Sequence, residues 1–160
     1  MNRNYLHTLM LACAAALLVA GCASMGGGNS GATVVASGDH SLIKDQEYKD
    51  IHTQADFDAL WDKAFKGMSG APDKPQVDFS KQMVLAAFIG DQNTGGYTIR
   101  FTKIDSTGPT IDVSILVTQP GQNCRVPQRL SDTYLIVAIP ASSKPVNFNN
   151  PQTERMPACG

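Results

Sequence analysis

Few side chains in this sequence are of the types that perform catalysis. Beyond the N-terminal apolar stretch lie two histidines, His40 and His52, and each flanks a predicted early strand instead of sharing a loop with a nucleophile. Residues 67–70 (GMSG) come closest to a nucleophile elbow, but their spacing is wrong and no helix follows. The sequence contains no His-Glu-x-x-His, paired Cys-x-x-Cys or acidic calcium-type loop, so no metal ligand set is visible. We therefore expect a protein that is not an enzyme and that uses no metal or cofactor.

The N-terminal stretch has the features of an export signal. Arg3 gives it a basic start, and residues 9–20 form an apolar run closed by small residues. This run is too short to span a bilayer as a helix, which needs about 20 residues. We expect residues 1–21 to be a signal peptide.

The end of this stretch carries a second signal. Residues 18–22, Leu-Val-Ala-Gly-Cys, resemble a bacterial lipoprotein lipobox. The resemblance implies cleavage after Gly21 and lipid on Cys22, and the acyl chains would hold the protein on a membrane. No Asp follows Cys22, and this pattern resembles the sorting signal of outer-membrane lipoproteins. The expected location is the bacterial cell envelope, at the outer membrane, with the periplasmic side and the cell surface both left open.

The remaining chain is organised as a tether and one domain. Residues 25–32 are rich in Gly and Ser without an apolar period, so residues 22–32 are expected to form the lipidated start and a flexible tether. Residues 33–160 are long enough for a single core. Cleavage removes Arg3 from the 13 basic residues, which leaves 12 against 14 acidic ones, a net charge of −2. With no basic patch among aromatic residues, a nucleic-acid partner is not expected.

Two cysteines remain in the expected mature domain. Cys13 leaves with the signal peptide and Cys22 is lipidated, so Cys124 and Cys159 form an even pair in an exported chain. Such pairs are usually oxidised. We predict a Cys124–Cys159 disulfide that fastens the C-terminal tail to the loop before the strand beginning at Tyr134.

Apolar periodicity predicts one helix among strands. Thr53 is a good N-cap with Asp56 as its capping-box partner, and Gly67 should end the helix. One helical stripe contains Phe57, Leu60, Trp61, Ala64 and Phe65. Strands are expected at 33–38, 46–52, 83–89, 97–104, 110–118 and 134–139, with an edge piece at 145–148.

These elements predict an α+β, mostly β fold. The strands at 83–89, 97–104 and 110–118 are expected to form an antiparallel meander, with the turn at 105–108 between the last two. The single helix should pack on a curved antiparallel sheet, or on a small β-sandwich or barrel.

Residues 90–100 (GDQNTGGYTIR) separate two of these strands. The adjacent Gly95 and Gly96 fit a hairpin turn, which would account for the segment without any function. The segment is nevertheless longer than a minimal turn, and polar side chains beside bare backbone can hydrogen-bond to an extended partner chain. Both interpretations stay open. The candidate partner-binding residues are Asp91, Gln92, Asn93, Thr94, Gly95, Gly96 and Tyr97.

Three arginines are also candidates for binding a carboxylate, namely Arg100, Arg125 and Arg129. A solvated strand face, or pairing with Asp112 or Asp132, is the favoured interpretation of these residues.

The segment from Val77 to Arg100 resembles the C-terminal domain family of protease complex subunit PrcB. The shared pattern is Asp-Phe-Ser, an apolar strand ending in Gly, a Thr-Gly-Gly-Tyr turn and an alternating strand. Residues 118–121 (TQPG) and 130–140 (LSDTYLIVAIP) resemble later motifs, so the likeness spans residues 37–148. One departure is at residues 131–134 (SDTY), where the family's later motif tends to read Thr-x-Pro-Tyr and this chain has Thr133 in place of the proline. Membership implies a lipoprotein subunit that supports a protease and implies no catalytic residues.

A weaker likeness concerns chagasin-type inhibitors of cysteine proteases. Residues 93–97 share only the Asn, Thr-Gly and Tyr of that inhibitory loop and lack its proline.

Three functions follow as hypotheses. The first is a membrane-anchored, non-enzymatic module that binds or stabilises a partner protein, such as an envelope or exported protease. The second is an inhibitor of exported proteases that acts through residues 91–97. The third is a purely structural envelope lipoprotein. The oligomeric state is left open.

Overall fold

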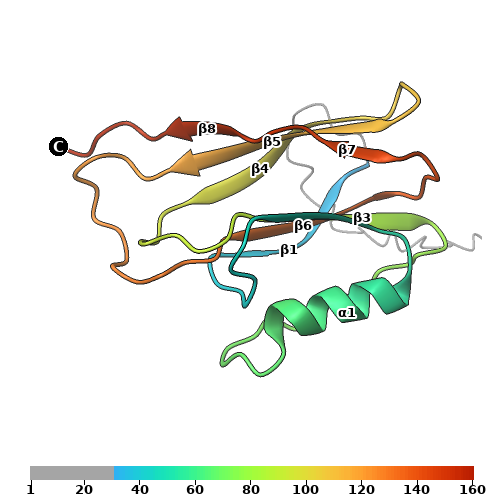
Figure 1. Cartoon of the computed structure of the whole chain (residues 1–160), viewed down its shortest axis with the longest axis horizontal. Helices are drawn as coiled ribbons and strands as arrows, with labels where there is room; N and C mark the ends of the chain where they lie inside the picture. Colours follow the sequence, from blue (N-terminus) through green and yellow to red (C-terminus); the bar gives the residue numbers. More distant parts are fainter. Residues whose placement is uncertain (1–30) are drawn as a thin grey trace, which may run out of the picture.

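A computed structural model of the protein describes residues 31–160 (Figure 1). The predicted signal peptide 1–21, the lipidation site Cys22 and nearly all of the predicted tether 22–32 lie outside the described residues. The order of elements is β1 (Thr33–Gly38), β2 (Glu47–Ile51), α1 (Gln54–Phe65), β3 (Gln82–Phe88), β4 (Thr98–Asp105), β5 (Ile111–Gln119), β6 (Tyr134–Pro140), β7 (Val146–Phe148) and β8 (Gln152–Arg155). In residues 31–160, no helix is long and apolar enough to cross a membrane.

The helix forms where the sequence predicts it. The Thr53 side chain accepts a hydrogen bond from the backbone amide of Asp56 at 3.1 Å, which confirms the N-cap. All five residues of the predicted apolar stripe are buried. The last helical residue is Phe65, and Gly67 follows with φ +81°, the left-handed conformation that commonly ends a helix.

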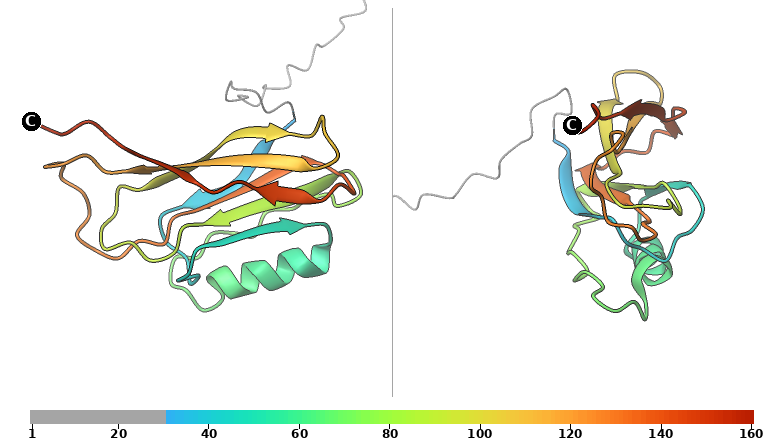
Figure 2. Two further views of the ribbon diagram at one scale, coloured as in Figure 1. Left: turned by 45° about the horizontal axis from the view of Figure 1, so that its top comes forward. Right: turned by 90° about the vertical axis from the view of Figure 1, so that its left-hand side faces the viewer.

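The first sheet has the strand order β1-β6-β3-β2, with every neighbouring pair antiparallel. Its two central strands, β3 and β6, are buried on both faces because two separate apolar layers cover them. Val84, Ala86 and Phe88 pack with α1 on one side of β3, while Met83, Leu85 and Ala87 face the second sheet. The molecule therefore has three layers, in the order helix, sheet, sheet (Figures 1 and 2).

The second sheet is built around β5. Strand β4 pairs with it antiparallel as the sequence predicts, with a register shift between Phe101 and Lys103. The other side of β5 carries β7 and then β8, both parallel to it. The edge piece at 145–148 is thus confirmed, but β8 was not predicted because Gln-Thr-Glu-Arg has no apolar alternation.

The predicted meander of three strands is wrong. Strands β4 and β5 pair, but β3 belongs to the first sheet, where β2 and β6 occupy both of its edges. Because both edges of β3 are already paired, no edge is left for β4. Among the described residues the fold is mostly β with one helix, and its two four-stranded sheets are largely antiparallel and not closed. The sandwich alternative is therefore found and the barrel is not.

The predicted disulfide is present. Cys124 lies in the connection between β5 and β6, and Cys159 lies just after β8, with their Cα atoms 4.9 Å apart. The C-terminal tail is thereby fastened to the loop before β6, as the sequence predicts.

Candidate functional site

Residues 91–97, called the crossover loop below, carry the chain from β3 in the first sheet to β4 in the second. The loop lies at one end of the sandwich (Figure 1). Since β3 and β4 do not pair, the hairpin interpretation of this segment is wrong. The side chains of Asp91 and Asn93 are exposed, Gln92, Thr94 and Tyr97 are half-buried, and Gly95 is buried.

Main-chain hydrogen bonds fix the crossover loop to the segment before β6. Gln92 and Ser131 exchange two backbone hydrogen bonds, of 2.8 and 3.0 Å, in an antiparallel bridge. The Ser131 hydroxyl donates to the carbonyl of Thr94 at 2.7 Å, and the amide of Gly95 donates to the carbonyl of Pro127 at 2.9 Å. The loop is therefore held at its beginning and its middle, while Asn93 between these points stays exposed.

The two adjacent glycines allow a close approach to the 126–127 segment. Gly96 has φ +90°, and a Cβ there would lie 2.8 Å from the Val126 side chain. Gly95 has no positive φ, but a Cβ there would lie 3.1 Å from the Pro127 ring. The third glycine of the motif, Gly90, has φ +73° and lies so close to the Lys44 carbonyl that a Cβ would approach its oxygen to 2.6 Å. Packing within the protein thus explains these glycines.

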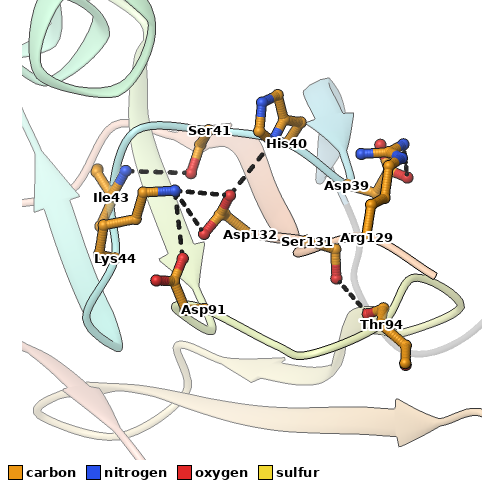
Figure 3. A network of polar contacts seen from close by, with 10 residues as sticks. All are labelled: Asp39, His40, Ser41, Ile43, Lys44, Asp91, Thr94, Arg129, Ser131 and Asp132. Atoms are coloured by element: carbon orange, nitrogen blue, oxygen red, sulfur yellow. Dashed lines mark hydrogen bonds and ion pairs between the residues drawn. The ribbon is translucent and has the colours of Figure 1, made fainter. Parts of the chain in front are cut away.

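A buried carboxylate anchors the start of the loop (Figure 3). The Asp132 side chain is fully buried, and Lys44 Nζ donates to both of its oxygens at 3.0 Å. His40 Nδ1 lies 3.2 Å from Asp132 Oδ2, and Lys44 Nζ lies 3.2 Å from Asp91 Oδ1. The backbone amide of Asp91 also donates to the Lys44 carbonyl at 2.9 Å. This cluster joins the β1–β2 connection, the loop and the start of β6.

The cluster has perturbed acid–base properties. Burial raises the pKa of Asp132, as does its contact with Asp91, while Lys44 opposes the rise. The interaction with Asp132 lowers the pKa of Asp91, and the hydrogen bond to Asp132 raises the pKa of Lys44. Lys44 and His40 both contact the buried carboxylate, so Asp132 has partners on the segment before β2 and acts as a structural anchor for the loop.

Arg100, Arg125 and Arg129 are all exposed, and the alternative that pairs them with Asp112 or Asp132 is wrong in its partners. Arg100 lies 3.6 Å from Glu154 of β8, and Arg129 lies 2.9 Å from Asp39. Asp132 is paired with Lys44 instead, and Asp112 accepts from Asn147 at 2.8 Å. The sequence could not show these pairs because each joins segments that are distant along the chain.

The remaining candidate groups are not gathered into a site. His52 contacts Asp50 at 3.0 Å, whereas His40 contacts Asp132. Over residues 31–160, no group of His, Cys, Asp and Glu side chains has the geometry to hold a metal ion.

Sequence reasoning did not find Ser131, Asp132 or Lys44 as functional partners of the loop. One signal was available: Ser131-Asp132-Thr133 are polar residues placed directly before an apolar strand, and all three are buried. Polar residues in such a position need partners, and the neighbouring loop supplies the partners of Ser131.

The arrangement of β3, the crossover loop, β4, β5 and β6 is the part of the chain with a known counterpart. Residues 83–140 match the family model described as PrcB C-terminal. The PrcB C-terminal match contains the loop, Ser131 and Asp132, whereas Lys44, the helix and the tail lie outside it. It confirms the family resemblance over a shorter range than the expected 37–148. No curated protein and no solved structure was found to match the chain.

Proposed function

We propose that this protein is a non-enzymatic binding module, anchored to a membrane of the bacterial envelope by lipid on Cys22, that holds or stabilises a partner protein. An envelope or exported protease is the proposed partner. The observation that carries the proposal is the crossover loop, which is fixed at several points by backbone hydrogen bonds and yet presents Asn93 to solvent. A preorganised loop loses little conformational entropy when it binds.

The PrcB C-terminal match supports this proposal because the matched segment includes the whole loop and its anchor on β6. The contacts of Asp132 with Lys44 and His40 also support a binding role, since they help to hold the crossover loop in one conformation. A loop positioned in this way is a typical place for recognition residues on a rigid scaffold.

Site-specific photo-crosslinking in intact cells tests the proposal. A photoreactive side chain at position 93 is expected to give a discrete crosslinked product, whose partner is identified by mass spectrometry. The matched control is position 106, which is equally exposed but lies at the opposite end of β4, in the β4–β5 turn. Equal products at both positions, or none at position 93, would contradict the proposal and leave a purely structural role.

Inhibition of exported proteases is a second candidate, favoured by the same fixed loop. A loop held in one conformation can enter an active-site cleft at low entropic cost. Titration of the full chain into papain-like and serine proteases should then give concentration-dependent inhibition that Asn93→Ala weakens. A panel of proteases that stays fully active would eliminate this candidate.

A further inference from the structure

The C-terminal tail, residues 152–160, occupies an edge of the second sheet without contributing to the core. Strand β8 pairs in parallel with the second half of β5, from Leu116 opposite Gln152 to Gln119 opposite Arg155. All four residues of β8 are exposed. The tail runs along this edge on the far side of the molecule from α1 (Figures 1 and 2). Backbone pairing and a few side-chain contacts, not apolar burial, therefore hold β8 in place.

One acidic side chain of the tail is specifically recognised. The Thr118 hydroxyl donates to Glu154 Oε1 at 2.9 Å, and Arg100 Nη2 lies 3.6 Å from the same oxygen. Thr118 is buried, although it belongs to a polar part of the strand. These side chains belong to a shallow depression lined by Thr98, Arg100, Thr118, Glu154, Arg155, Met156 and Pro157. The sheet thus supplies a hydroxyl and a guanidinium to a carboxylate that arrives on an added strand.

The covalent anchor of the tail lies beyond the strand. The Met156 amide continues the pairing by donating to the Gln119 carbonyl at 2.9 Å, and the Cys159 amide donates to the Gln122 carbonyl at 3.0 Å. The Cys124–Cys159 disulfide closes this end. Breaking that bond would leave the tail attached by the four-residue pairing, by the Met156 and Cys159 amides and by the side chains of Glu154 and Arg155, with no buried side chain in β8.

We propose that the edge of β5 at residues 116–119, with Thr118 and Arg100, is a strand-addition site for an extended partner segment carrying a carboxylate, and that the tail is its internal occupant. The seated tail defines the ligand: a parallel strand with Glu or Asp at the position of Glu154. Strand addition of this kind draws affinity from main-chain hydrogen bonds and specificity from alternate side chains. The inference does not rest on the crossover loop, and its tests follow the tail strand, so either proposal can fail alone.

Reduction of the disulfide is the step that makes the edge available. A protein dithiol or dithiothreitol delivers two electrons and two protons, the Sγ–Sγ bond breaks, Cys124 and Cys159 become thiols, and the reductant becomes a disulfide. The freed tail then exchanges with a competing segment at a rate set by its local opening.

Hydrogen exchange of the full chain tests whether reduction of the disulfide frees the tail. Adding dithiothreitol should raise the exchange of backbone amides at 152–156 by about tenfold or more, because local opening no longer breaks a covalent loop. The amides of β3 and β6 serve as the internal control and should stay protected. Unchanged protection of the tail after complete reduction would overturn the proposal.

Disulfide trapping tests whether the edge of β5 binds an added segment that carries a carboxylate. The full chain carrying Cys159→Ser is mixed under mild oxidation with a synthetic peptide of residues 150–160, whose own cysteine can form a mixed disulfide with Cys124. The Glu-containing peptide should be trapped at Cys124 about tenfold more than the same peptide with Glu154→Gln, as expected for losing one hydrogen bond to a charged group. Mass spectrometry of proteolytic fragments locates the bond.

The chain itself provides the matched controls for trapping. Thr118→Val and Arg100→Gln should each remove the preference for the Glu peptide, while Thr102→Val, exposed on β4, should leave it intact. Equal trapping of the Glu and Gln peptides would overturn the assignment of a carboxylate ligand. If the reduced wild-type chain reoxidises to a dimer linked between Cys124 of one copy and Cys159 of another, the occupant is a second copy's tail and the assignment to a foreign segment is overturned.

Discussion

The crossover loop and the C-terminal tail are two irregular segments that are held in opposite ways. The loop is fixed by backbone bridges, a buried carboxylate and glycines that pack against neighbouring backbone. The tail buries no side chain in β8 and is fixed by strand pairing and one disulfide. The loop therefore belongs to the cooperative core, whereas the tail can open locally without unfolding the domain.

The largest expected effect on stability comes from Gly90→Ala, directly before the crossover loop. The substitution places a Cβ 2.6 Å from the Lys44 carbonyl oxygen at φ +73°, so strain and overpacking together should lower the free energy of unfolding by about 4 kcal/mol. Urea denaturation measures the loss. Gly70→Ala is the control, because Gly70 has φ +75° but open space around it, and it should cost only about 1 kcal/mol. Similar losses for the two variants would show that the loop is not tightly packed there.

Lys44→Met is expected to have the next largest effect. It leaves the buried Asp132 carboxylate without its ammonium partner, which should cost about 3 kcal/mol at pH 7. Asp132→Asn, which resembles the neutral acid, should stay within about 1 kcal/mol of wild type, and the double variant should recover most of the loss. A double variant as unstable as Lys44→Met would contradict the assignment of Asp132 as a buried charge.

The pH dependence follows from the raised pKa of Asp132. A carboxyl group whose pKa is raised on folding contributes stability that is fully present below its unfolded value, near 3.8, and that is lost as the pH rises through the folded pKa. Removing Lys44 raises that pKa further, so the deficit of Lys44→Met should shrink between pH 7 and pH 5. The opposite case is Asp78, whose pKa is lowered to about 2 by Ser80 and Lys81, so its contribution is lost only as the pH falls below 4. Urea denaturation of Lys44→Met and wild type at pH 7 and pH 5 checks whether the deficit shrinks at the lower pH.

Removing the disulfide with Cys124→Ser and Cys159→Ser should cost less than its loop length suggests. A closed loop with a sequence separation of 35 residues corresponds to about 4 kcal/mol of chain entropy, provided that the native geometry survives. Because the native tail is also set free, we expect a net loss of about 1–2 kcal/mol and a large increase of exchange confined to the tail. Urea denaturation measures the loss of stability, and hydrogen exchange measures the opening of the tail. A loss of the full entropic amount would mean that the tail is part of the cooperative core.

The smallest expected effect on global stability is that of Gly121→Ala. A Cβ at this position would lie 2.0 Å from the Pro157 carbonyl oxygen, a closer approach than at Gly90. In the chain with the disulfide reduced the tail can move away, so there we expect a loss below about 1 kcal/mol, with raised exchange at residues 156–159. The contrast with Gly90→Ala is the most direct test of the comparison, since the worse clash should have the smaller consequence.

Local pattern and cysteine pairing predicted much of this fold. The helix, its cap, the buried central strands and the disulfide all follow from residue types and spacing along the chain. The pairing of strands did not follow, because β3 and β4 are consecutive yet lie in different sheets. Alternation reports which faces of a strand are buried, but it does not report which strand lies beside it.

The candidate site was likewise predicted in its local sequence but not in its contacts. The sequence singled out residues 91–97, but it explained their glycines by a turn instead of by contacts with Val126 and Pro127. The partners Lys44 and Asp132 are separated by 88 positions, and no local pattern connects them. Strand β8 was missed because a strand held by backbone pairing alone needs no apolar residues.

The position of β6 has a consequence for how the chain acquires its structure. It lies between β1 and β3, with Thr33 opposite Ala138 and Gln82 opposite Pro140, so the first sheet cannot assemble until nearly the whole domain is available. Contacts between residues so far apart in sequence slow folding, typically into the millisecond-to-second range. The chain should therefore stay open until residues up to 140 are available for pairing, and α1 should have no complete sheet to pack on before that moment.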